Sequence, residues 1–204
     1  MKKTALIIGI GGQDGALLAK LLLKKNYIVI GTSNNTCNSV IINLKKLNIK
    51  KSLKIFKYSM GNMRQLMNVI KSTNPDEIYM FAGFSKTNNS ILKSKKILMT
   101  YIKSTIDLLN INLKVDKKKK IFFSCSSEIF QKKNNINFLD ETSRCEPDNP
   151  YGLAMLNVLN ISNIYRKYYD MFISVGIFFN HESFLRPKSF LSKISFSNLK
   201  SKII

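Results

Sequence analysis

The stretch Thr4-Ala-Leu-Ile-Ile-Gly-Ile-Gly-Gly-Gln-Asp-Gly15 leads from an apolar run into a glycine-rich turn. A leucine-rich helical pattern, Ala16–Lys25, follows the turn. Gly9, Gly12 and Gly15 permit a tight turn in which backbone N–H groups approach a phosphate, and the positive end of the helix supports the negative charge. The stretch therefore predicts a pyrophosphate site for a dinucleotide. A turn that only packs a helix on a strand is the alternative.

Short apolar segments and longer helical patterns alternate along the rest of the chain. This alternation is typical of a parallel sheet whose strands are joined by helices. The sequence therefore predicts an α/β fold with a Rossmann-like, doubly wound parallel sheet. The expected strands are Thr4–Ile10, Tyr27–Gly31, Ser52–Tyr58, Glu77–Ala82, Lys120–Ser124 and Phe172–Phe178, and the expected helices are Ala16–Lys25, Met63–Ser72, one ending near Leu113, and Tyr151–Tyr168.

The regular pattern is lost after Phe190. A length of 204 residues fits one domain, at about 150 residues per domain. We expect a dinucleotide-binding domain over residues 1–190 and a divergent C-terminal tail over residues 191–204. The chain is expected to stop where a substrate-binding domain would begin.

The chain is strongly basic, with 33 Lys and Arg against 12 Asp and Glu and a net charge of +21. Lysine supplies 29 of the basic residues and arginine only 4, spread along the whole sequence. Specific nucleic-acid recognition more often concentrates arginine on one face. We interpret the charge as compositional and expect no specific nucleic-acid partner, with non-specific, salt-sensitive attraction to polyanions as the alternative.

Cysteine and histidine are too sparse for a metal site. Cys37, Cys125 and Cys145 form no CxxC pair, and His181 is the only histidine. The apolar run at the N-terminus is interrupted by glycines too early for a secretion signal. No segment contains the roughly 20 continuous apolar residues of a membrane span. We therefore expect no metal, no membrane association and a cytoplasmic location.

A serine cluster and a tyrosine occupy the places where a short-chain dehydrogenase/reductase carries its catalytic groups. Ser126 follows the fifth expected strand, and Tyr151 opens a helix directly after Asn149 and Pro150. A serine hydroxyl can polarise a substrate hydroxyl or carbonyl while a tyrosine hydroxyl exchanges a proton with it. A phenol with a pKa of about 10 needs a nearby cation to work at neutral pH. One turn further along stands Met155.

Several motifs together resemble the GDP-mannose 4,6-dehydratases, and the resemblance covers roughly residues 4–190. It implies an extended short-chain dehydrogenase/reductase fold and bound NADP. It also implies conversion of GDP-mannose to GDP-4-keto-6-deoxymannose by internal oxidation, water elimination and reduction. The motifs that carry it are Gly9-Ile-Gly-Gly-Gln-Asp-Gly15, Pro75-Asp-Glu-Ile-Tyr79, Ser126-Ser-Glu128, Pro150-Tyr-Gly-Leu-Ala154 and Gly176-Ile-Phe-Phe-Asn-His-Glu-Ser183.

The resemblance also implies roles for individual residues. Ser126 takes the place of the catalytic threonine, Glu128 that of the acid/base for water elimination, and Tyr151 that of the catalytic tyrosine. Each has a structural alternative, as a helix-entry carboxylate for Glu128, a core aromatic for Tyr151 and a surface ring for His181. The residues expected to bind the cofactor are Gly9, Ile10, Gly11, Gly12, Gln13, Asp14, Gly15, Ser85, His181 and Arg186.

Departures from the family pattern point to weak or absent catalysis. Met155 replaces the lysine that would hold the nicotinamide ribose and lower the pKa of the tyrosine, and a thioether is a poor hydrogen-bonder. Asn34-Asn35 replace a basic pair that would meet the NADP 2′-phosphate, with no acidic residue in its place, so NAD and NADP both remain open. Met60-Gly61 stand in place of an Asp-Leu pair near the adenine, and Phe81–Phe84 alter the fourth-strand segment.

The sequence therefore predicts a GDP-mannose 4,6-dehydratase-like protein that is weak or inactive. One alternative is a non-catalytic module that binds a dinucleotide or pairs subunits, including as a homo-oligomer. The other is a drifting sequence that folds poorly.

Overall fold

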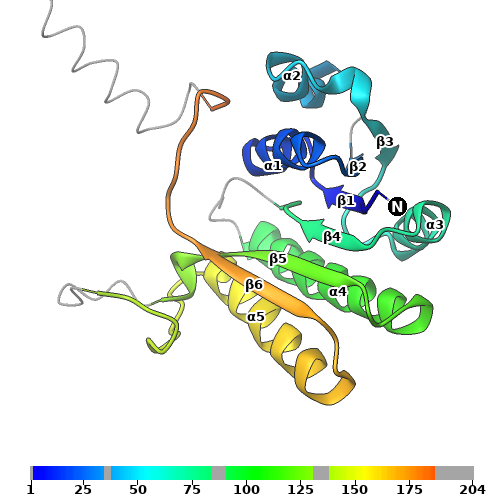
Figure 1. Cartoon of the computed structure of the whole chain (residues 1–204). Helices are drawn as coiled ribbons and strands as arrows, with labels where there is room; N and C mark the ends of the chain where they lie inside the picture. Colours follow the sequence, from blue (N-terminus) through cyan, green and yellow to red (C-terminus); the bar gives the residue numbers. More distant parts are fainter. Residues whose placement is uncertain (1, 35–37, 84–90, 131–137, 187–204) are drawn as a thin grey trace, which may run out of the picture.

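The computed structural model describes residues 2–34, 38–83, 91–130 and 138–186 of the chain. Within them, six parallel strands form one sheet in the order β3-β2-β1-β4-β5-β6 (Figure 1). The strand order reverses beside β1, which is the switch point where doubly wound sheets bind ligands. The strands are β1 Thr4–Ile8, β2 Ile28–Ser33, β3 Lys54–Lys57, β4 Glu77–Met80, β5 Lys120–Ser126 and β6 Ile173–Phe178.

Helices cover both faces of this sheet, and the residues of β1 show how. Leu6 and Ile8 belong to the apolar cluster formed with α3, α4 and α5, whereas Ala5 and Ile7 belong to the cluster formed with α1 and α2. Alternate side chains of a strand point to opposite faces, so β1 is buried on both sides. The helices are α1 Gln13–Lys24, α2 Asn38–Lys46, α3 Met63–Thr73, α4 Ile91–Val115 and α5 Pro150–Tyr169, with short 3₁₀ turns η1 Lys50–Ser52 and η2 Ser127–Ile129.

The prediction of a Rossmann-like α/β sheet is confirmed. The strand ends differ from the predicted ends by at most two residues, and two helices also differ from the prediction. Helix α1 begins at Gln13 rather than Ala16, so the last part of the glycine stretch is helical. Helix α2 was not expected from the sequence, because its Asn and β-branched residues disfavour helix. Burial of Leu44 in the cluster beneath α1 and α2 stabilises it.

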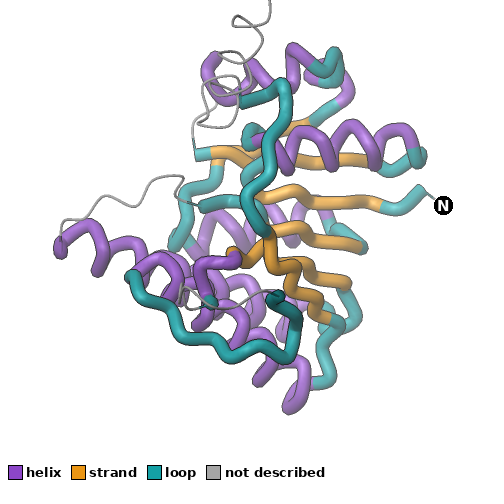
Figure 2. Tube along the Cα trace, turned by 90° about the vertical axis from the view of Figure 1, so that its left-hand side faces the viewer, coloured by secondary structure: helices purple, strands orange, loops and turns teal. Residues whose placement is uncertain are grey.

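The two longest helices, α4 and α5, lie side by side beneath β5 and β6 (Figure 1). After β6 the chain continues as a loop that passes across the carboxyl ends of the strands toward α1 (Figure 2). This loop, residues 179–186, brings the last described part of the chain to the glycine turn at the start of α1. The sheet switch point is therefore bordered by segments from both ends of the described chain.

No helix in the described residues is long and apolar enough to cross a membrane.

Candidate functional site

The glycine turn after β1 is shaped by its backbone. Gly9 has a φ of +91°, and a Cβ there would lie 2.6 Å from the backbone nitrogen of Ala82. A Cβ on Gly15 would lie 2.5 Å from the carbonyl oxygen of Gly9. The N-cap of α1 is Gly12, which has no side chain to cap the helix. The positive end of α1 is thus available to an anion, as in phosphate-binding turns.

Not all of the predicted loop residues face the site. Gly9, Gly11, Gly12, Gln13 and Asp14 line cavities at this edge of the sheet. The side chain of Ile10 instead points into the core and packs within the space beside Gly31. Gly15 is buried and seats α1 against the turn. The side chain of Ile10 and the close approach at Gly15 therefore shape the turn, and the contact of these two residues with a cofactor stays a prediction.

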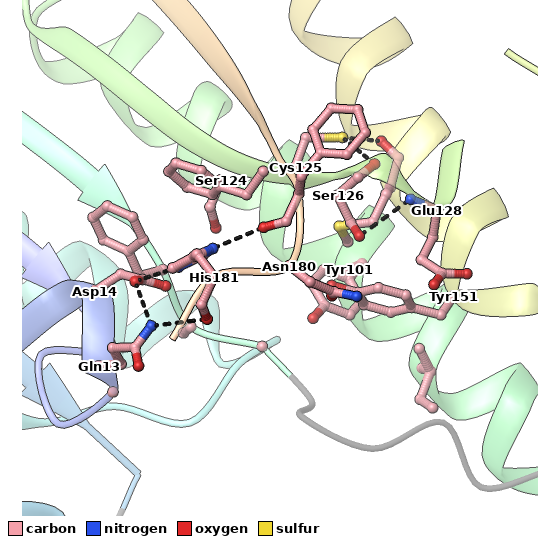
Figure 3. Close-up of a pocket in the computed structure, with 18 of the residues that line it drawn as sticks. Gln13, Asp14, Tyr101, Ser124, Cys125, Ser126, Glu128, Tyr151, Asn180 and His181 are labelled. Atoms are coloured by element: carbon pink, nitrogen blue, oxygen red, sulfur yellow. Dashed lines mark hydrogen bonds and ion pairs between the residues drawn. The ribbon is translucent and has the colours of Figure 1, made fainter. Parts of the chain in front are cut away.

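The loop after β6 is attached to the start of α1 by hydrogen bonds (Figure 3). His181 Nε2 lies 2.7 Å from Asp14 Oδ1, and the Ser183 hydroxyl donates to Gln13 Oε1 at 2.8 Å. His181 Nδ1 lies 2.8 Å from the carbonyl oxygen of Phe179, which can only accept, so this nitrogen carries a proton. The carbonyl of Phe179 and the carboxylate of Asp14 together raise the pKa of His181 above its ordinary value of 6.5.

A second group of polar residues lies where α5 begins. Asn149 caps α5, because its Oδ1 accepts from the backbone N–H of Gly152 at 2.8 Å. Its Nδ2 donates to Glu128 Oε2 at 2.8 Å. A Cβ on Gly152 would lie 2.2 Å from the carbonyl oxygen of Glu128, so only glycine allows α5 to approach η2 this closely. The cap and the glycine together place Tyr151 beside Glu128 and Ser126.

Tyr151 forms hydrogen bonds with the side chains of Ser126 and Tyr101. The Tyr101 and Tyr151 rings also meet edge to face, with centroids 5.9 Å apart. Burial raises the pKa of Tyr151 above its usual value of 10.0, and the hydrogen bonds from Ser126 and Tyr101 offset this only in part. The phenol therefore holds its proton at neutral pH.

Met155 occupies the position one turn along α5 from Tyr151. It is only 2% exposed and lines the same cavity as Tyr151. Its backbone carbonyl accepts a hydrogen bond from the Cys125 thiol, whose pKa burial raises to about 11. Among the described residues lining this cavity, positive charge can come only from His181 and Arg186, both on the loop after β6. Helix α5 contributes none there.

Two cavities meet at the carboxyl edge of the sheet. The larger, about 900 Å³, contains Ser126, Glu128 and Tyr151, and the smaller, about 440 Å³, lies over the ends of β2 and β3. They share a border made of Gly12, Phe81, Ala82 and Gly83. The glycine turn thus stands between a catalytic-type cluster and a second compartment, which is the arrangement that a dinucleotide needs across a switch point.

The remaining predicted residues fall in different places. Arg186 is exposed and lines the larger cavity. Asn34 and Met60 line the smaller cavity. Ser85, Asn35 and Phe84 lie outside the described residues.

Sequence reasoning missed two residues that complete the site. Tyr101 comes from the middle of α4 and carries only the signal of a buried helical face, since it lies four residues after Ile97. Asn43 comes from the unexpected helix α2, and its amide donates to the carbonyl of Gly11 at 3.0 Å. Neither contact has a local pattern in the sequence.

The described residues contain no group of three or more His, Cys, Asp or Glu side chains arranged to hold a metal ion.

Comparison with known proteins shows the family of the chain. A family model described as GDP-mannose 4,6 dehydratase matches residues 6–201. The chain is 30% identical over 201 residues to GDP-mannose 4,6 dehydratase of Dictyostelium discoideum, covering 94% of this chain and 56% of that protein. It is 31% identical over 199 residues to GDP-mannose 4,6-dehydratase of Sinorhizobium fredii, with the same coverage of 94% and 56%. The chain thus spans about half the length of the curated relatives it matches.

Solved structures give the same fold at lower identity. dTDP-glucose 4,6-dehydratase from Bacillus anthracis in complex with NAD superposes with a TM-score of 0.82 and 19% identity, over 98% of this chain and 62% of that one. UDP-glucuronic acid 4-epimerase from Bacillus cereus, in complex with UDP-glucuronic acid and NAD, gives a TM-score of 0.80 and 20% identity, over 97% and 63% of the two chains. The fold is that of extended short-chain dehydrogenases/reductases, and the chain belongs to the GDP-mannose 4,6-dehydratase family.

Proposed function

We propose that this chain binds a nicotinamide dinucleotide across the two joined cavities and acts on GDP-mannose weakly or not at all. The observation that carries the proposal is the convergence of Ser126, Glu128 and Tyr151 on a cavity that begins at the glycine turn. A second observation supports the weak activity: Met155 lines the same cavity, at the position where the family resemblance expects a lysine. The family relatives supply the substrate class, and the NAD in the similar solved structures supports the cofactor class.

The residues present fit a dinucleotide. At Gly12 the space that a side chain would occupy is open apart from the carbonyl oxygen of Gly9 at 3.4 Å, and Gly12 is the N-cap of α1. Gly11 and Gly12 would hold the pyrophosphate by their backbone, with the adenosine half in the smaller cavity and the nicotinamide half near Tyr151. Asn34, which lines the smaller cavity, is neutral, so it would neither attract nor repel the 2′-phosphate that distinguishes NADP from NAD. When bound, the nicotinamide would supply reversible hydride transfer, with the hydride taken from a carbon that bears a hydroxyl group returned to the carbon that has lost its hydroxyl group.

The polar residues of the larger cavity then have distinct tasks. Tyr151 would take the proton of the substrate hydroxyl, and Ser126 would hold that oxygen by a hydrogen bond. Glu128, held by the Asn149 amide, would remove a proton next to the new carbonyl and return it to the departing hydroxide as water.

Weak turnover follows from the state of Tyr151. Taking a proton requires a phenolate, and burial raises the pKa of Tyr151 instead of lowering it. No lysine or arginine on α5 lines the cavity to oppose this effect. Loss of one positioned acid/base element commonly costs about 10²- to 10⁴-fold in rate. We expect dinucleotide binding to be retained and dehydration of GDP-mannose to be slower than in a lysine-containing relative by such a factor.

Thermal unfolding with and without NADP and NAD tests the binding part of the proposal. A ligand at 100 times its dissociation constant stabilises a fold by about 2.7 kcal/mol, which is a shift of several degrees for a chain of about 200 residues. A cooperative transition that neither nucleotide moves up to millimolar concentration would contradict dinucleotide binding. Turnover of GDP-mannose, followed by the 4-keto product, tests the second part. Robust turnover that Tyr151→Phe abolishes would contradict the proposed weakness.

A further inference from the structure

Lys96 is placed by α4 at the smaller cavity. It lies one turn before Thr100, and both residues line that cavity. The other face of the same stretch, with Ser94, Ile97 and Tyr101, lines the larger cavity. Helix α4 therefore forms a wall shared by the two compartments, and its spacing of three to four residues directs Lys96 toward the smaller one.

Lys96 is also the one charged side chain among the described residues that line this cavity. The other polar groups there are neutral hydroxyls and amides, such as those of Thr32, Ser59 and Asn34. No Asp or Glu occurs in the sequence between Asp14 and Asp76, the stretch that forms β2, α2, β3 and α3. The described residues that line the cavity likewise include no Asp or Glu, so Lys96 faces no carboxylate among them.

The cavity also contains Gly9, Gly11 and Gly12 of the phosphate-type turn. A primary ammonium group beside such a turn is a common partner of phosphate. We propose, on the basis of the function proposed above, that Lys96 binds a phosphate group of the dinucleotide. It supplies from α4 the charge that Asn34 does not supply from the end of β2. The group bound is either the pyrophosphate, present in NAD and NADP, or the 2′-phosphate, present in NADP alone.

Calorimetric titration of NADP and NAD into the wild-type chain and the Lys96→Gln variant tests this inference. Lys95→Gln is the matched control, because Lys95 is the exposed neighbour on the same helix and lines neither cavity. Both variants lose the same charge from the surface. We expect Lys96→Gln to weaken NADP binding by about tenfold, as for loss of one charge-assisted hydrogen bond, with the difference shrinking at high salt. Lys95→Gln should bind as the wild type does.

The pattern across the two nucleotides identifies the phosphate. Weaker binding of NADP alone assigns Lys96 to the 2′-phosphate, and equal weakening of both assigns it to the pyrophosphate. Unchanged affinity of Lys96→Gln for both nucleotides overturns the inference, as does equal weakening by Lys95→Gln. Absence of binding to the wild-type chain is a different result, because it contradicts dinucleotide binding itself. Thermal melts without nucleotide should be equal for the three proteins, since both lysines are exposed.

Discussion

The glycine turn before α1 and the first two turns of α5 face the same cavity. The proposed role of the first depends on backbone atoms, and that of the second depends on side chains. The turn depends on backbone, through the positive φ of Gly9 and the uncapped start of α1. The proposed role of the start of α5 depends on side chains, namely the hydroxyl of Tyr151 and the side chain one turn later, at position 155. In this chain the backbone features of the turn are present, and Met155 stands one turn after Tyr151.

Under the proposed function, the two parts of the site differ in how they tolerate substitution. Met155 is almost fully buried and packs within the main apolar cluster, where a thioether is well suited to fill the space. A charged residue in that place would carry a desolvation cost. Under the proposed function, Met155 therefore fills the core and leaves the site without a catalytic cation. A substitution at Gly9 has no such freedom, because a Cβ there meets backbone atoms.

The substitution Met155→Lys should have the largest effect. A lysine reaching the cavity beside Tyr151 would lower the pKa of its phenol and raise GDP-mannose turnover by about 10²- to 10⁴-fold. The rate is measured as GDP-mannose turnover, and the pKa by alkaline absorbance titration of the tyrosines. Met155→Leu is the volume-matched control for both. A folded Met155→Lys protein whose turnover and titration match those of Met155→Leu would show that charge at this position is not what limits the site.

Gly9→Ala tests the backbone half of the comparison. The positive φ and the contact with Ala82 should together cost about 2–4 kcal/mol of the free energy of unfolding. Dinucleotide stabilisation should be lost as well. Gly12→Ala is the control, since φ is negative there and a Cβ would meet only the Gly9 carbonyl at 3.4 Å. Equal effects of the two substitutions in urea unfolding would argue against a special geometry at Gly9.

Asn149→Ala separates helix capping from positioning of Glu128. Removing an Asn cap costs about 1 kcal/mol of the free energy of unfolding. Asn62→Ala should cost the same, because Asn62 caps α3 in the equivalent way, by accepting from the backbone N–H of Gln65. Only Asn149→Ala also removes the amide that donates a hydrogen bond to the Glu128 carboxylate. In the Met155→Lys background, turnover should fall for Asn149→Ala and stay level for Asn62→Ala. A parallel fall in both would reduce the role of Asn149 to capping.

The smallest expected effect concerns His181 and pH. Its folded-state pKa lies above the ordinary value of 6.5, so its protonated contacts stabilise the fold fully below about pH 6.5, and this contribution disappears as pH rises through the folded-state pKa. The side chain is 46% exposed, so the contribution should stay below about 1 kcal/mol. Melting of the wild type and His181→Gln should differ at about pH 5.5 and converge at about pH 8.5. A constant difference at both values would exclude this titration.

Much of the fold could be predicted from the sequence, because its signals are local. Apolar runs bounded by polar or glycine residues mark β1 and β5, and Asn149-Pro150 marks the start of α5 as an N-cap followed by proline. The glycine stretch marks the turn at the switch point. The grouping of Ser126, Glu128 and Tyr151 was expected from family resemblance, and the structure places them at one cavity.

Other parts were decided only by tertiary structure. Helix α2 forms because Leu44 is buried against its neighbours, although its own residues disfavour helix. Tyr101 lines the larger cavity and Lys96 the smaller one, because the two side chains lie on different faces of α4, which forms a wall of both cavities. The contact of His181 with Asp14 joins positions 167 residues apart. The sequence by itself determined most of the individual strands and helices and the glycine turn, since these depend on neighbouring residues. The pairing of distant side chains depends instead on how the crossover connections pack the helices against the sheet.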